Sequence, residues 1–120
     1  MVADACYIGC NKMYDEIFGW IKTGPAQPTL YITTEQDLSE VQTMMLAFLS
    51  NVNEDHIIDG QYEGDEEERV YEACKILKNS SLYIEQLPDF SLQDVENKIK
   101  RNIRDHDIKY VFNPKRVLGE

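Results

Sequence analysis

The residues of this sequence best placed to do chemistry are polar groups that follow a short apolar run. Leu30 to Ile32 are apolar or aromatic, two threonines come next, and Glu35 follows directly. An acid just beyond the carboxyl end of a buried strand can face a bound phosphate or polarise a water for attack. An acid at the start of a helix is also a routine choice that suits the helix dipole. The residue types alone therefore leave a catalytic and a structural interpretation of Glu35 open.

A second candidate is a basic stretch on one predicted helix. It comprises Lys98, Lys100, Arg101 and Arg104. Such side chains can neutralise DNA phosphates. The chain has a formal net charge of −10, however, with much of the acid in one run from Glu63 to Glu68. That balance disfavours nucleic-acid binding by this chain alone, and a solvated helix face is the favoured interpretation.

The cysteines and histidines do not form a recognisable metal site. Cys6 and Cys10 are four residues apart and Cys74 is remote, so we expect all three to pack as small apolar side chains. His56 and His106 each stand beside aspartate near a predicted helix end, where a polar ring commonly rests. We therefore expect no metal ligands and no catalytic histidine.

The elements that position these groups follow from the spacing of apolar residues. Gaps of three and four predict helical structure from Val2 to Lys22, in one piece or broken near Asn11. Further helices are predicted over 38–50, 54–58, 65–78 and 92–103. The apolar stripe of the helix over 65–78 comprises Val70, Ala73, Cys74 and Leu77. The apolar stripe of the helix over 92–103 comprises Leu92, Val95, Ile99 and Ile103. Short strands are predicted over 29–33, 82–85 and 109–112.

Strands that alternate with helices pair in parallel through right-handed crossovers. The predicted fold class is therefore α/β, with a small open parallel sheet of about three short strands flanked by helices. Ligands of such sheets bind at the carboxyl ends of the strands, which is where Glu35 stands in the sequence.

The composition is that of one globular domain. The chain has 120 residues, of which 42% are hydrophobic and 28% charged, which argues against disorder. No apolar run approaches the roughly 18 residues of a membrane helix. The first residues also lack the basic start of a secretory signal. We therefore expect a cytoplasmic chain without a membrane partner.

Several segments, taken in order, resemble the C-terminal ATPase domain of DnaB-type replicative DNA helicases. They are MVADACYIG at the start, LYITTEQDLSEVQTMMLAFLSNVNEDHI from Leu30, IIDGQYEGDEEERVYEACKIL from Ile57, and SLYIEQLPDFSLQDVENKIKRNIRDHDIKYVF from Ser81. The resemblance covers about Val2 to Phe112. No single motif is highly specific, but the ordered set is.

The resemblance implies a truncated RecA-like P-loop NTPase fold and a role for individual residues. Glu35 matches the glutamate that activates water for attack on the γ-phosphate. The helix from Val2 matches the helix that follows the phosphate-binding loop, and the strand ending at Phe112 matches the one that carries the magnesium-linked aspartate. In the parent family the cofactors are ATP and Mg²⁺, and the working form is a hexameric ring around single-stranded DNA.

Two departures from the family pattern bear on activity. The sequence contains no G-x-x-x-x-G-K-[ST] run, whose backbone N–H groups and lysine hold phosphates, and Met1 falls where the following helix begins. Phe112 is followed by Asn113 and Pro114, not aspartate. We therefore expect a partial ATPase domain over 1–112, an unstructured or unrelated tail over 113–120, and neither ATP nor Mg²⁺ bound.

Three functional hypotheses follow, of which the third, an intact enzyme of another kind, has no substrate that the residues indicate. The first is a helicase ATPase fragment that is inactive by itself. The second is a small α/β interaction module that self-associates or binds a protein partner. Ile17, Phe18 and Trp20 are candidates for an exposed apolar patch that would support the second.

Overall fold

The computed structural model describes residues 2–33, 36–87 and 92–112 of the chain. The elements run in the order α1 (Val2–Gly9), β1 (Lys12–Asp15), β2 (Gly19–Lys22), β3 (Thr29–Thr33), α2 (Leu38–Ser50), α3 (Glu54–Asp59), α4 (Glu66–Lys78), β4 (Leu82–Gln86), α5 (Leu92–His106) and β5 (Tyr110–Phe112). The predicted α/β class is confirmed. The expected tail over 113–120 lies outside the described residues.

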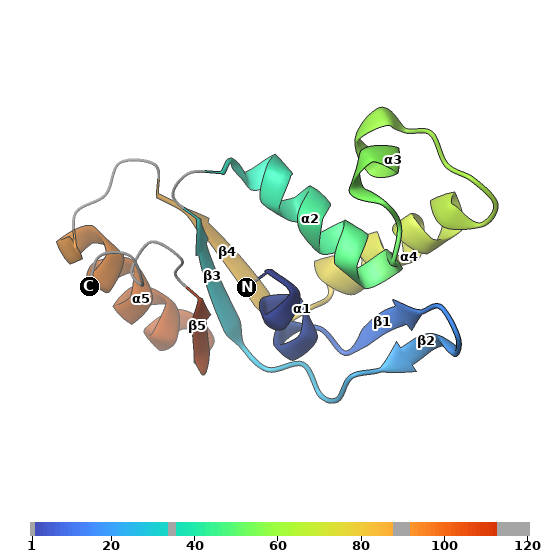
Figure 1. Ribbon diagram of the computed structural model, residues 1–120. Coiled ribbons are helices and arrows are strands. Elements are labelled where there is room, and N and C mark those ends of the chain that lie inside the picture. Colours follow the sequence, from blue (N-terminus) through green and yellow to red (C-terminus); the bar gives the residue numbers. More distant parts are fainter. Residues whose placement is uncertain (1, 34–35, 88–91, 113–120) are drawn as a thin grey trace.

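β3 is the centre of a three-stranded parallel sheet with the order β4-β3-β5. Thr29 pairs with Leu82 on one side and with Tyr110 on the other. Each neighbour is reached through helices, as parallel pairing requires. The predicted parallel sheet of three strands is therefore present in the described part of the chain (Figure 1).

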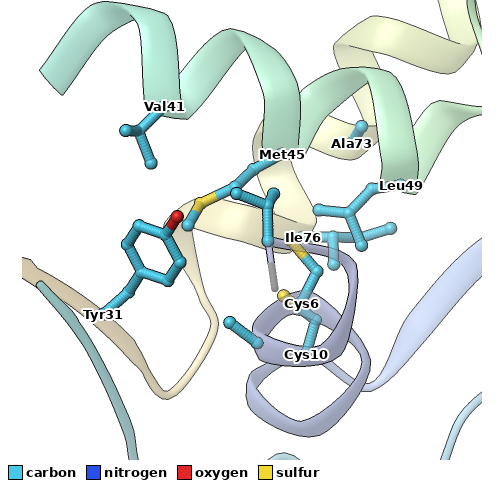
Figure 2. Close-up of a cluster of buried hydrophobic side chains, with 10 residues drawn as sticks. Cys6, Cys10, Tyr31, Val41, Met45, Leu49, Ala73 and Ile76 are labelled. Carbon is cyan, nitrogen blue, oxygen red and sulfur yellow. The ribbon is translucent and has the colours of Figure 1, made fainter. Parts of the chain in front are cut away.

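The sheet separates two apolar layers because successive side chains of a strand point to opposite faces. All five residues of β3 are buried. Tyr31 packs in the layer formed by α1, α2 and α4, together with side chains such as Cys6 and Met45 (Figure 2). Leu30 and Ile32 pack on the other face, against α5. The continuous apolar run of β3 thus reflects a strand covered on both sides.

Local capping explains where α2 begins and ends. Asp37 accepts a hydrogen bond from the backbone N–H of Glu40, which is a helix N-cap. Asn51 adopts the left-handed conformation at φ 56° and closes the helix C-terminus. The predicted end of this helix near Ser50–Asn51 is confirmed.

The prediction of helical structure throughout Val2 to Lys22 is wrong in its second half. Only α1 is helical, and β1 and β2 form an antiparallel hairpin in which Tyr14 pairs with Trp20. Asp15 and Gly19 flank the turn, and Gly19 has a φ of 76°. A three-residue loop followed by a left-handed glycine is a common hairpin connection. Turn chemistry and aromatic cross-strand pairing outweighed the apparent helical spacing.

Two predicted helix stripes also need correction. In α4, Cys74 is exposed and Ile76 is buried in its place. In α5, Val95 is buried, but Leu92 and Ile103 are exposed. A helix of 15 residues spans about 22 Å, whereas strands of three to five residues span roughly 10–17 Å. The ends of α5 therefore extend beyond the sheet that it covers.

No helix in the described ranges is both long enough and apolar enough to cross a bilayer.

Candidate functional site

The carboxyl edge of the sheet is formed by the ends of three parallel strands. Thr33, the last residue of β3, pairs with Gln86, the last residue of β4, and Tyr31 pairs with Phe112 at the end of β5. In open parallel sheets this edge is where ligands bind. The central strand β3 leads to the middle of the edge.

The chain on either side of Glu35 is held in place at this edge. Thr33 is buried, and its hydroxyl donates to the backbone carbonyl of Gln36 at 2.9 Å. The backbone N–H of Leu87 donates to the carbonyl of Thr33 at 2.9 Å. Glu35 itself lies outside the described residues, so its predicted role stays a prediction.

The first helix points its N-terminus toward the same edge. Its last residues lie at the opposite edge, because the carbonyls of Ile8 and Gly9 accept from the N–H groups of Gln27 and Ser81, which stand just before β3 and β4. From there α1 packs along β3, with its N-terminal residue Val2 in the same buried cluster as the middle of the strand. Figure 1 shows α1 lying against the sheet beside β3 and β4. The positive end of the helix dipole is thus directed to the carboxyl edge.

Gly9 makes this close approach possible. A Cβ atom at that position would lie 2.9 Å from the Cβ of Leu82. Any larger residue would therefore push α1 away from the start of β4. The position of α1 on the sheet depends on this glycine.

A carboxylate occupies the N-terminus of α2. Asp37 accepts hydrogen bonds from the N–H of Glu40 at 2.9 Å and from the hydroxyl of Ser39 at 2.8 Å. The hydrogen bond from the Glu40 N–H, followed by that from Ser39, lowers the pKa of Asp37 below its ordinary value of 3.8. This helix start is satisfied by its own side chain and is a poor place for a phosphate.

A sequence profile for the DnaB-like helicase C terminal domain matches residues 2–113. The chain belongs to the DnaB-like helicase family. Its parallel sheet flanked by helices is a truncated RecA-like fold, as the resemblance implied.

A prophage protein is similar to most of this DnaB-like chain. The SPbeta prophage-derived uncharacterized protein YorI of Bacillus subtilis strain 168 is 33% identical over 113 residues. The match covers 93% of this chain but 22% of that protein. The chain thus spans about a fifth of the relative that it matches.

The residues of this DnaB-like chain do not supply a complete nucleotide site. The sequence has no G-x-x-x-x-G-K-[ST] run to hold phosphates. The first turn of α1 contains the carboxylate of Asp4, which would repel a phosphate. Phe112 ends β5 and is followed by asparagine in the sequence, not by a metal-binding aspartate. On these residues we expect that the chain does not hold ATP and Mg²⁺ by itself.

The structure separates the predicted basic stretch on α5 into two parts. Lys98 is half-buried, and its ammonium lies 3.8 Å from Glu85 on β4. That glutamate also accepts from the buried Asn102 amide at 3.2 Å, which makes Lys98 part of the helix–sheet contact. Lys100, Arg101 and Arg104 are exposed on the opposite face of the helix. A contact between these three side chains and DNA stays a prediction.

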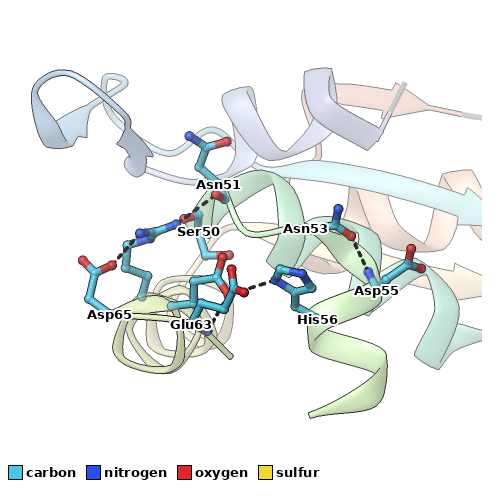
Figure 3. Close-up of polar contacts among 9 residues, drawn as sticks. Ser50, Asn51, Asn53, Asp55, His56, Glu63 and Asp65 are labelled. Carbon is cyan, nitrogen blue, oxygen red and sulfur yellow. Dashed lines mark hydrogen bonds and ion pairs between the residues drawn. The ribbon is translucent and has the colours of Figure 1, made fainter. Parts of the chain in front are cut away.

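A polar network that the sequence did not indicate joins α2, α3 and α4 (Figure 3). Arg69 donates to the carbonyls of Ser50 at 3.1 Å and Asn51 at 3.0 Å, and pairs with Asp65 at 2.7 Å. Its guanidinium also lies 4.5 Å from the ring centroid of Tyr14 in the hairpin. Arg69 therefore ties the end of α2, the start of α4 and β1 together.

His56 takes part in the neighbouring contact between α3 and α4. Its Nδ1 lies 2.9 Å from Oε1 of Glu66, which also accepts from the N–H of Glu63. These contacts lower the pKa of Glu66, the Glu63 N–H having the largest effect and His56 the next. His56, Glu63 and Glu66 each offer one atom that could bind a metal ion. These atoms lie within 4.8 Å of one another, which no other group of three such side chains does in the described ranges. The contacts with His56 and with the Glu63 N–H account for the position of the Glu66 carboxylate in this group.

The expectation for the cysteines is confirmed at two positions. Cys6 and Cys10 are buried, and burial raises the pKa of both thiols, that of Cys10 to about 11. The expectation is wrong for Cys74, which is exposed.

Proposed function

We propose that this chain is the glutamate-bearing part of a DnaB-like helicase ATPase domain and that it does not hydrolyse ATP by itself. The observation that carries the proposal is the direction of α1, whose N-terminus is aimed at the edge where β3 ends. Glu35 follows β3 by two residues in the sequence. An acid at that point is suitably placed to activate a water for attack on a γ-phosphate.

The same residues explain why we expect no turnover. Phosphoryl transfer depends on positioning and on neutralising phosphate charge, which a P-loop lysine and a bound Mg²⁺ supply. The sequence offers neither a G-x-x-x-x-G-K-[ST] run nor an aspartate after Phe112. Binding of ATP and Mg²⁺, assembly into a hexamer and translocation on single-stranded DNA are then properties of a whole helicase in the cytoplasm.

Nucleotide binding by the purified chain tests this proposal. We expect no thermal shift and no phosphate release with ATP and Mg²⁺. A longer chain, with a strand and a G-x-x-x-x-G-K-T loop joined ahead of Val2, should gain a thermal shift. When Asn113→Asp is also made in that longer chain, turnover should appear, and Glu35→Gln should then retain binding but lower turnover by about 10²–10⁴-fold.

Glu40→Gln is the matched control, because this acid also lies near the start of α2 and its side chain is exposed. It should change neither binding nor turnover. Tight ATP binding by the chain as it stands, or unimpaired turnover in Glu35→Gln, would overturn the proposal.

A second function, self-association, is favoured by a separate observation. Ile17 is 83% exposed and Phe18 77% exposed at the tip of the hairpin, whereas Trp20 is half-buried. Large apolar side chains presented together mark contact surfaces. Light scattering over a range of chain concentrations tests this function, and an unchanging monomer mass would exclude it.

We propose no DNA binding by this chain alone. Its three exposed basic residues on α5 are too few to offset a net charge of −10. Fluorescence anisotropy with labelled single-stranded DNA should show no binding. A salt-sensitive rise that is lost on Lys100→Glu and Arg101→Glu would contradict this.

A further inference from the structure

The tip of the β1–β2 hairpin holds its two apolar side chains in a fixed turn. Oδ1 of Asp15 accepts from the N–H of Ile17 at 2.8 Å and from that of Phe18 at 3.0 Å. Gly19 completes the turn in a conformation with positive φ. Ile17 and Phe18 are thus exposed on a loop whose conformation is fixed by hydrogen bonds.

The strands of the hairpin are anchored to the helices through Tyr14. The rings of Tyr14 and Trp20 meet edge to face at a centroid distance of 5.3 Å. Arg69 lies over Tyr14 and is itself held by the carbonyls at the end of α2. Figure 1 shows the hairpin extending from the body as an arm. An apolar tip on an anchored arm loses little conformational freedom when it binds.

An apolar groove lies elsewhere on the same chain, between α2, α4 and the outer strand β4. Its volume is about 510 Å³, within the range of roughly 300–1,000 Å³ that accommodates small ligands. The residues that line it include Leu38, Leu46, Cys74, Leu77, Lys78 and Ile84. None of the hairpin residues lines this groove, so one chain does not fill its groove with its own tip.

We propose that the hairpin tip of one copy of this chain docks in the β4 groove of a second copy. This proposal rests on the self-association proposed above and names its two surfaces. Ile17 and Phe18 would enter the apolar groove. Glu16, beside them at the tip, is opposite in charge to Lys78 of the groove, and such a pair fixes the orientation of docking.

The symmetry of this contact follows from its two different surfaces. A tip and a groove make a head-to-tail interface, which leaves one free tip and one free groove in every dimer. Growth can therefore continue into a ring or a filament. Two side chains in a groove cover much less than the roughly 800 Å² per partner of a stable complex, so the association is weak. Repulsion between chains of net charge −10 should weaken it further at low salt.

Sedimentation velocity at increasing chain concentration tests the proposal with one variant of each surface. Phe18→Ser removes the tip contact, and Cys74→Glu places a charge in the groove at an exposed helix position. Each should weaken association roughly 30-fold, as loss of a central contact does. Tyr7→Ser is the control, because Tyr7 is 53% exposed and belongs to neither surface. Unchanged melting curves would show that the variants fold.

Mixing the two variants distinguishes head-to-tail docking from other contacts. The Phe18→Ser chain keeps its groove and the Cys74→Glu chain keeps its tip, so an equal mixture should form heterodimers and nothing larger. Glu16→Lys and Lys78→Glu should each weaken association, and the two together in one chain should restore it.

The outcomes separate the two proposals. A wild-type chain that stays monomeric at every concentration overturns both this proposal and the self-association function. Association that persists undiminished in Phe18→Ser and Cys74→Glu overturns the docking surfaces alone. A mixture that stays monomeric, or that grows beyond dimers, overturns the head-to-tail arrangement.

Discussion

Arg69 offers the sharpest test of how the hairpin and the helices are held together. We expect Arg69→Met to destabilise the chain, because methionine keeps much of the packing but cannot donate to the carbonyls of Ser50 and Asn51. Hydrogen bonds from a charged donor contribute about 1.5–3 kcal/mol each, although water will replace part of what is lost. The contact with the Tyr14 ring adds about 0.5–1 kcal/mol. The pair with Asp65 adds little because that carboxylate is 58% exposed.

These contributions sum to roughly 3.5–7 kcal/mol, and because water bonded to the two carbonyls recovers part of that, the expected net loss is about 2–4 kcal/mol. A chain of 120 residues has an unfolding entropy of about 0.25 kcal/mol/K. The melting temperature should therefore fall by about 8–16 °C. Arg69→Lys keeps the charge without the planar, forked donor, so it should lose roughly half as much.

Thermal melts followed by circular dichroism measure the global effect. The fluorescence of Trp20, the chain's one tryptophan, reports on the hairpin separately. Lys75→Met is the matched control, since it removes the same charge from the same helix but only a contact with the exposed Tyr71 ring. A melting temperature for Arg69→Met within about 3 °C of the wild type would refute the reasoning.

Three further outcomes are expected. Gly9→Ala should lower the free energy of unfolding by about 1–3 kcal/mol in urea titrations, because its Cβ would meet Leu82 at 2.9 Å; Asp4→Ala on the exposed face of α1 should have little effect by comparison. The folded-state pKa of Asp37 is lowered, so this carboxylate stabilises the fold above its unfolded pKa and the contribution is lost as pH falls through the folded pKa. Asp37→Asn should therefore flatten the acid limb of a stability–pH profile below about pH 4, and an unchanged limb would contradict the assignment. Ellman's reagent should modify one thiol per chain quickly, Cys74, and the two buried cysteines only on unfolding; three fast thiols would disprove the described burial.

Periodicity predicted the layers of this fold well where an element is covered by its neighbours. β3 was identified from five residues of β-branched, apolar and aromatic type, and it is buried along its whole length. The end of α2 near Ser50 was also predicted, and Asn51 closes the helix there in the left-handed conformation that asparagine tolerates. In these cases local preference and tertiary packing agree, which is why single-sequence reasoning succeeded.

The hairpin was missed because its signal lies in the turn and not in the period. Met13, Ile17 and Trp20 have helical spacing, but Asp15 and Gly19 form a tight turn whose hydrogen bonds favour a hairpin. The contacts of Arg69 were equally invisible, because they join residues 18 and 19 positions apart through side chains. At the carboxyl edge, the sequence predicted which strand precedes Glu35. The role of that glutamate stays a prediction, since it lies outside the described residues.

The pairing of β3 has a consequence for how the chain is made. Both partners of this strand, β4 and β5, come much later in the sequence, and β5 ends near the last described residue. Such non-local pairing is slow, because long loops must close before any contact stabilises them. During synthesis the apolar face of β3 that α5 covers stays unprotected until α5 has also left the ribosome. We therefore expect that chaperones bind incomplete chains, and that incomplete chains aggregate, through the exposed side chains of Leu30 and Ile32.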